Sequence, residues 1–394
     1  EWLELTPEEA EAARAQAAQA ASSYRRQALA SFRHELGTLR ITPDRAALFV
    51  RRYELEAQAA PSLAEQAAEE GEIPPGELPP VVTPTPTPIV LPPVAPTGFN
   101  GVNLDSGQYW DTTVNYSETQ FEYMKAWGVK AVRITIQGYS IEAGVMKNAT
   151  FLSRLDDMIA WALKQGFKVI LDGVHLAGNC VHGKYRSRVD HWFTEHWTWA
   201  GFLDHWKQLA TRYKGKGVIY DLMNEPLYWP LGDHQAKMRQ CVDNVREIDP
   251  GATVMIEAVS PESWDKQDFT FVETHPIDRP NLVYSVHVYG YHFSVNTQAA
   301  IRGKLSALKT NIPKAKGYPV HVTEVGPGKN GEPNAPWDTW QGTFLKNLLT
   351  VIRDDKYAGF AAWRWVSGGW TAEKLLADYE GNPSPYGAIV KQFL

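Results

Sequence analysis

From residue 98 onward, short apolar runs rich in β-branched residues alternate with amphipathic segments of helical period,. We expect eight strands, over residues 98–104, 130–136, 168–174, 218–224, 253–259, 281–289, 319–325 and 359–365. The longer amphipathic segments predict helices over residues 151–166, 200–213, 233–248, 297–311 and 339–354. Apolar strands that alternate with helices indicate a parallel sheet covered on both faces.

Eight such units in about 300 residues match the size of a (β/α)8 TIM barrel. The predicted fold class is therefore α/β, with a closed barrel over residues 98–394. An open, doubly wound sheet is the alternative, but no GxGxxG or GxxxxGK[ST] motif follows an expected strand,. The missing motifs disfavour a nucleotide-binding fold.

A different composition precedes the barrel. Residues 1–73 hold 18 alanines and no lysine, with helix-start signals at Thr6 and Thr42,. We expect an Ala-rich helical segment with too little apolar bulk to fold alone. Its expected partner is another copy of the chain, a larger assembly or the barrel, and a solvated helical stalk is the alternative. Residues 74–97 hold ten of the 26 prolines and predict a Pro/Thr-rich linker,.

Charge and hydropathy restrict the class of partner. The 394-residue chain is 44% hydrophobic and carries a net charge of −6, so we expect no nucleic-acid binding,. No run approaches about 18 consecutive apolar residues, which predicts no membrane span. Cys180 and Cys241 lack zinc-site spacing and are expected to be free thiols, with one disulfide as the alternative,. We expect a removed signal peptide and an extracellular or cell-surface location, the common setting of Pro/Thr-linked modules.

In such a barrel the active site lies at the carboxyl ends of the strands. Two glutamates close apolar runs there, Glu225 after Leu222-Met223-Asn224 and Glu324 within residues 320–326. Strands four and seven are three positions apart in the ring, so their ends face each other across the mouth. A protonated and an ionised carboxyl are what hydrolysis of a glycosidic bond requires. For either glutamate alone, a structural ion pair is the alternative interpretation.

These motifs resemble glycoside hydrolase family 5, the cellulase-like family of clan A, across residues 98–394. The most specific matches are Asn-Glu-Pro at 224–226 and Thr-Glu-Val-Gly at 323–326. His-Val-Tyr at 287–289, the strand-two Arg133 and the strand-one Asn103 also match. The resemblance implies a retaining mechanism, with Glu225 as the acid/base and Glu324 as the nucleophile.

The resemblance further implies a set of supporting residues. Arg133 and Tyr289 would hold Glu324 ionised, while Asn224 would bind the sugar 2-hydroxyl and His287 would orient the acid or the sugar. The expected substrate contacts are Asn103, Arg133, His175, Asn224, His287, Tyr289, Trp363 and Trp365. Trp363 or Trp365 should form the floor of the sugar subsite.

Other strand-end residues fit the pattern less well. His175 comes one position later than the family's histidine, so it reaches the site only if the strand end bends,. Asp105, Asp172 and Glu257 are interpreted as network or packing residues.

The expected activity is cleavage of a β-linked polysaccharide or oligosaccharide, with endo-β-1,4-glucan as the first candidate and other β-glucans or β-mannans as alternatives. A second hypothesis is a carbohydrate-binding or assembly protein that displays the barrel through residues 1–73. A third is a metal-dependent hydrolase that uses His182, His191 and His196. The spacing of these histidines does not match a metal site, so we expect no metal and no cofactor.

Overall fold

The computed structural model describes residues 98–105, 116–136, 149–172, 199–226, 231–260, 266–328, 336–366, 374–378 and 380–394. The predicted helical segment 1–73 and the linker 74–97 lie outside the described residues, so their boundaries stay predictions. Several singled-out side chains also lie outside them: Asp105, His175, Cys180, His182, His191 and His196.

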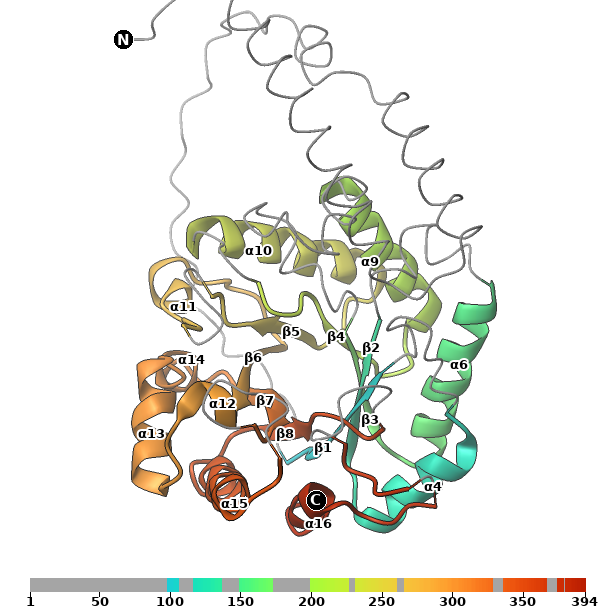
Figure 1. The fold of residues 1–394 in the computed structure, drawn as a ribbon. Helices are drawn as coiled ribbons and strands as arrows, with labels where there is room; N and C mark the ends of the chain where they lie inside the picture. The colour runs from blue at the N-terminus through green and yellow to red at the C-terminus, as the bar shows by residue number, and fades with distance from the viewer. Residues whose placement is uncertain are drawn as a thin grey trace, which may run out of the picture. The chain divides into compact units, whose positions relative to one another are not determined.

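Eight parallel strands close into a barrel in sequence order, with β8 paired to β1. They are β1 (Gly101–Asp105), β2 (Ala131–Thr135), β3 (Lys168–Asp172), β4 (Ile219–Asp221), β5 (Val254–Glu257), β6 (Leu282–Tyr289), β7 (Val320–Gly326) and β8 (Gly359–Ala362). Each strand overlaps its expected run, and the predicted (β/α)8 fold is confirmed. Figure 1 shows the ring closing where the cyan β1 meets the red β8.

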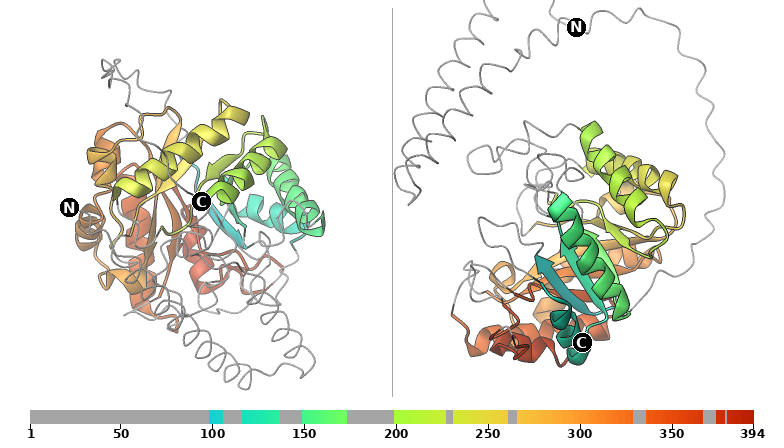
Figure 2. Two further views of the ribbon diagram at one scale, coloured as in Figure 1. Left: turned by 90° about the horizontal axis from the view of Figure 1, so that it is seen from above. Right: turned by 90° about the vertical axis from the view of Figure 1, so that its right-hand side faces the viewer.

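Helices surround the strands, as the views in Figures 1 and 2 show. The longer ones lie close to their predicted bounds: α6 (Ala149–Lys164), α9 (Trp199–Tyr213), α10 (Leu231–Ile248) and α15 (Thr339–Asp354). The predicted helix 297–311 is divided into α13 (Gln298–Ala307) and α14 (Asn311–Ala315). The break coincides with Lys309, whose φ of 58° is left-handed,. The other described helices are α4 (Glu118–Trp127), α11 (Phe271–Thr274), α12 (Gly290–Phe293) and α16 (Pro385–Val390).

The apolar core has two parts. A large cluster fills the space between strands and helices, and includes Trp206, Phe344 and Tyr386. A small cluster comprises one residue near the start of most strands or just before it: Phe99, Ala131, Ile170, Ile219, Met255, Val283 and Ala358. Because side chains alternate between the two faces of a strand, residues two positions apart share a face. The small cluster therefore forms an apolar floor inside the barrel.

The same alternation places polar side chains above this floor. Two positions after Ala131, Ile170, Ile219 and Met255 come Arg133, Asp172, Asp221 and Glu257, all buried. On each of these four strands, the inward-facing side chain is apolar at one position and charged two residues later. The charged side chains therefore form a layer directly above the apolar floor.

The ladder is irregular near the carboxyl end of β7, in its pairing with β6 and in its pairing with β8. Val286 pairs with Val322, but the next residue, His287, pairs with Glu324 because one residue is skipped. A bulge of this kind re-aims the side chains beyond it. The pairing of β7 with β8 is shifted over the same stretch.

Within the described ranges, no helix combines the length and the apolarity that crossing a bilayer requires.

One buried hydroxyl connects the last helix to the strand that carries Glu324. The hydroxyl of Tyr386 in α16 donates a 2.6 Å hydrogen bond to the carbonyl of Val325 in β7. Tyr386→Phe should lower the free energy of unfolding by about 0.5–1.5 kcal/mol, because one buried hydrogen bond is lost while the N–H of Trp363 still donates to the same carbonyl,. Urea denaturation measures the change. Tyr123→Phe is the matched control, since the Tyr123 hydroxyl forms no hydrogen bond within the described residues. Equal urea midpoints for both variants would contradict the prediction.

Candidate active site

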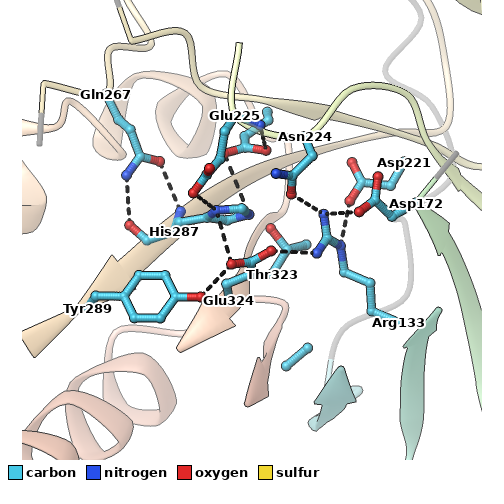
Figure 3. Close-up of polar contacts among 12 residues, drawn as sticks. Arg133, Asp172, Asp221, Asn224, Glu225, Gln267, His287, Tyr289, Thr323 and Glu324 are labelled. Carbon is cyan, nitrogen blue, oxygen red and sulfur yellow. Dashed lines mark hydrogen bonds and ion pairs between the residues drawn. The ribbon is translucent and has the colours of Figure 1, made fainter. Parts of the chain in front are cut away.

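The candidate site lies where β2, β4, β6 and β7 end, and its side chains point toward one another in Figure 3. Six predicted residues meet there: Arg133, Asn224, Glu225, His287, Tyr289 and Glu324. They come from four strands that are far apart in the sequence. The closed ring is therefore what assembles the site.

Arg133 is the hub of the buried network. Its Nε lies 2.8 Å from Asp221, and Nη1 lies 2.8 Å from Glu324 and 3.1 Å from the Asn103 oxygen. Nη2 lies 2.8 Å from the Asn224 oxygen and 3.1 Å from Asp172. These five contacts match the five N–H donors of a guanidinium. Arg133 is completely buried, so it positions its neighbours, which corrects the expectation that it contacts substrate.

The charges around Arg133 perturb the groups that form the network. Burial alone would lower the pKa of the guanidinium, but Asp172, Asp221 and Glu324 outweigh it and raise the pKa well above the usual value. Burial also raises the pKa of Asp221 to about 6; Arg133 opposes this rise and the Asp172 charge adds to it. One cation thus faces three carboxyl groups, and Asp221 takes up part of the excess negative charge as a proton.

Glu324 is held by donors on both oxygens. Oε1 accepts from Arg133 at 2.8 Å, and Oε2 accepts from the hydroxyl of Tyr289. Donors on both oxygens fix the orientation of the carboxyl group. The glycine of the Thr-Glu-Val-Gly motif makes room for this arrangement, since a Cβ at Gly326 would come 2.3 Å from the Tyr289 ring.

Glu225 is in a different environment. Its side chain is 24% exposed, against 4% for Glu324. Its Oε1 lies 3.0 Å from Nδ1 of His287, which is also 3.5 Å from Oε2 of Glu324. The backbone at Glu225 is left-handed, with φ 49°, a conformation that costs a non-glycine residue about 1 kcal/mol. This backbone turn directs the Glu225 side chain toward His287.

Two further residues that sequence reasoning did not single out support the site. Asp221 contacts Arg133. It could have been found as a charged residue that shares a strand face with Ile219 in an otherwise apolar strand. Gln267 binds the backbone of His287 on both sides, accepting from its N–H at 2.9 Å and donating to its carbonyl at 2.7 Å. No local pattern marks Gln267, which precedes an isolated bridge between Val259 and Asp268.

The network and packing role expected for Asp172 and Glu257 agrees with their contacts. Asp172 contacts Arg133, and Oε2 of Glu257 accepts the backbone N–H of Glu225 at 2.8 Å.

Two predicted substrate contacts are wrong. Trp365 is fully buried, and its ring packs edge-on against Trp127 of α4 at 4.7 Å, on the helix side of the barrel. Asn103 is also buried, and its amide donates to the carbonyls of Thr323 and Ala361 while its oxygen faces Arg133. Both residues therefore stabilise the barrel. Trp363, which is 8% exposed and stacks on the guanidinium of Arg364, stays the candidate for the sugar platform.

The arrangement can cleave an acetal. Single oxygens of Glu225 and Glu324 and a ring nitrogen of His287 lie within 4.8 Å of one another. Carboxyl groups about 5–5.5 Å apart suit attack by one of them on the anomeric carbon, whereas about 6.5–9.5 Å leaves space for a water. Among the described residues, this trio is also the group with the geometry to hold a metal ion. The polarised carboxyl pair, however, fits covalent acid–base chemistry without one.

Comparisons with known proteins agree with this chemistry. A family model described as "Cellulase (glycosyl hydrolase family 5)" matches residues 91–369. An endoglucanase of Paenibacillus polymyxa is 27% identical over 217 residues, which cover 48% of this chain and 53% of the relative. A probable glucan 1,3-beta-glucosidase A of Aspergillus fumigatus is 28% identical over 173 residues, 40% of each protein. The chain thus spans about half or less of the length of these relatives.

A solved structure shows the same fold. The β-glucanase SdGluc5_26A of Saccharophagus degradans, solved with cellotetraose, superposes with a TM-score of 0.59 at 19% identity. The alignment covers 75% of this chain and 86% of that one.

The raised pKa of Asp221 predicts a pH-dependent stability. An aspartate that titrates at about 6 in the folded state and at about 4 when unfolded binds its proton more tightly when folded,. Its contribution to stability is therefore complete below pH 4 and is lost as the pH rises to 6. The free energy of unfolding of wild type relative to Asp221→Asn should fall by on the order of 1–3 kcal/mol across this window. Urea denaturation at several pH values measures it. Asp233→Asn, at an exposed position, is the control. A difference in unfolding free energy between wild type and Asp221→Asn that does not change with pH would contradict the prediction.

Proposed function

Because the chain belongs to glycoside hydrolase family 5, whose members are retaining O-glycosyl hydrolases, we propose that it is an endo-β-1,4-glucanase with Glu225 as acid/base and Glu324 as nucleophile. One observation carries the assignment of roles. Two facing carboxyl groups have oxygens within 4.8 Å, and one is bound by Arg133 and Tyr289 while the other is more exposed and faces a histidine. Two environments for two carboxyls are what a division into nucleophile and acid requires.

The reaction follows in two steps. In the first, a Glu324 oxygen forms a bond to the anomeric carbon while the bond to the leaving oxygen breaks, and the proton of Glu225 moves to that oxygen. In the second, Glu225 takes a proton from water, whose oxygen attacks the anomeric carbon and releases Glu324. Arg133 and Tyr289 stabilise Glu324 as a leaving carboxylate in this second step.

Asn224 and His287 complete the arrangement. The oxygen of Asn224 is occupied by Arg133 at 2.8 Å, so its amide nitrogen is the atom left to donate to a sugar hydroxyl,. We assign it to the 2-hydroxyl, a contact that strengthens as charge develops on the anomeric carbon. Nδ1 of His287 orients the carboxyl of Glu225.

The choice of substrate rests on the relatives. The similarity to an endoglucanase and to a β-glucanase solved with cellotetraose supports β-1,4-linked glucose as the substrate. The similarity to a glucan 1,3-beta-glucosidase favours β-1,3-glucan as the second candidate. We also propose an extracellular or cell-surface location, because the Pro/Thr-rich composition of residues 74–97 is common in linkers of exported proteins,. Residues 1–73 would then serve as an assembly or anchoring segment.

The first test is sugar release from a panel of soluble β-1,4-glucan, β-1,3-glucan, mixed-linkage glucan and β-mannan. We expect release from β-1,4-glucan by wild type and none by Glu324→Gln, because the amide cannot attack the anomeric carbon. Glu225→Gln should lose about 10²–10⁴-fold in rate. The exposed Glu122→Gln is the control. Activity that survives Glu324→Gln would overturn the assignment of the nucleophile, and silence of folded wild type on the whole panel would overturn the substrate class.

The stereochemistry gives an independent test. Because a Glu225 oxygen and a Glu324 oxygen lie within 4.8 Å, the first product formed should keep the β configuration,. Proton NMR of the anomeric signal, recorded before mutarotation equilibrates it, distinguishes the outcomes. An α product at early times would show that water attacks directly.

A further inference from the structure

Glu257 contacts two parts of the proposed acid/base apparatus from one buried carboxyl group. It ends β5, and its Oε2 accepts the backbone N–H of Glu225 at 2.8 Å. Its Oε1 lies 3.5 Å from Nε2 of His287, longer than a hydrogen bond, as is common for catalytic contacts before substrate binds,. The other ring nitrogen of His287, Nδ1, lies 3.0 Å from Oε1 of Glu225. Glu257, His287 and Glu225 therefore form a line from the barrel interior to the mouth.

Glu257 is 1% exposed, and its contacts differ from those of the other buried carboxyl groups. Asp172, Asp221 and Glu324 all contact Arg133, whereas Glu257 contacts the backbone of Glu225 and the ring of His287. These two partners are the groups that set the position of the Glu225 carboxyl. The direct contacts of Glu257 therefore lead to Glu225, through its backbone and through His287.

The hydrogen-bond chemistry of the line restricts where protons lie. A backbone N–H can only donate, so Oε2 of Glu257 is an acceptor. A neutral imidazole has one donor nitrogen and one acceptor nitrogen. If Nε2 of His287 donates to Oε1 of Glu257, Nδ1 must accept, and the group that faces Nδ1 is the carboxyl of Glu225. A protonated Glu225 then donates to Nδ1, which is the form that a general acid needs.

We propose that Glu257 is a positioning residue for the reaction: it holds the backbone of Glu225 and sets the tautomer of His287, so that Nδ1 accepts the proton of Glu225. The inference rests on the proposed role of Glu225 as the acid/base. A carboxylate that fixes a histidine tautomer through its far nitrogen is a general device in catalytic and metal sites.

Opposing influences act on the charge of Glu257. Burial raises the pKa of Glu257, and the charges of Glu225 and Asp221 raise it further, whereas the backbone N–H of Glu225 and the charge of Arg133 lower it. The other titratable groups around Glu257 are His287 from β6, Glu324 from β7 and His234 from α10. Two carboxyl groups that share a site in this way hold one proton between them. Our proposal places that proton on Glu225, and the tautomer of His287 reports its position.

The tautomer can be observed directly. Long-range ¹H–¹⁵N NMR of the full chain labelled at histidine distinguishes the two tautomers, and His287→Gln identifies the signal of His287. We expect a proton on Nε2 and a bare Nδ1 in wild type. In Glu257→Gln the amide oxygen can still accept from Glu225, but the NH₂ then faces Nε2, so the proton should move to Nδ1. A wild-type His287 already protonated at Nδ1, or a signal that Glu257→Gln leaves unchanged, would overturn the proposal. The wild-type spectrum decides the point even if the variant fails to fold.

Kinetics separate positioning from a general loss of structure. Glu257→Gln should slow hydrolysis of unactivated β-1,4-glucan by about 10–100-fold, part of the 10²–10⁴ that general acid catalysis contributes. The leaving group of 2,4-dinitrophenyl β-cellobioside needs no proton, so Glu257→Gln should cleave this substrate at a rate within about threefold of the wild-type rate. The alkaline limb of kcat/KM should move to lower pH, because the Nδ1–H tautomer favours ionised Glu225.

The exposed Glu273→Gln in α11 is the matched charge control and should resemble wild type. Equal losses on both substrates with an unmoved pH limb would leave Glu257 a purely structural role and refute the proposal. If wild type cleaves neither substrate, the proposed function fails, while the NMR result still decides the inference about Glu257.

Discussion

The charge balance around Arg133 is the constraint on which the rest of the site depends. A buried guanidinium is tolerated only if its donors are satisfied, and here five acceptors from five residues surround it,. Those acceptors come from β1, β3, β4, the segment that follows β4, and β7. The strands must therefore close in register before the network can form. Removing one partner of such a network is costly because it leaves the other charges buried and uncompensated. The barrel and the chemistry therefore depend on the same contacts.

Most of the candidate site could be predicted from the sequence because the placement of its residues follows from periodicity. Glu225 and Glu324 close apolar runs, and parallel strands in a barrel bring their carboxyl ends to one face. His287 and Tyr289 are two residues apart and therefore share a face of β6. Resemblance to a family added the division of roles between the two glutamates. None of these inferences needed the position of a single side chain.

The errors have two physical causes. Trp365 lies three residues beyond β8 and faces the helices. Asn103 lies in the middle of β1 and faces Arg133, but its amide already donates to the carbonyls of Thr323 and Ala361. Which face a side chain takes near a strand end depends on where the pleat stops. The skipped residue between β6 and β7 shows how a ladder can change phase without a local signal,. Gln267 was missed because its partner, His287, is 20 residues away in the sequence, so no local pattern connects them.

The apolar floor of the barrel has a consequence for proton movement. Phe99, Ala131, Ile170 and their neighbours fill the interior beneath the charged layer, with the buried His321 stacked on Phe99. Within the described residues, the polar network reaches solvent at the mouth, where Glu225 lies. Among the carboxyl groups of the site, Glu225 is the most exposed. The residue that we propose as the acid/base, which would give up and recover a proton in every turnover, is therefore the one with direct access to solvent.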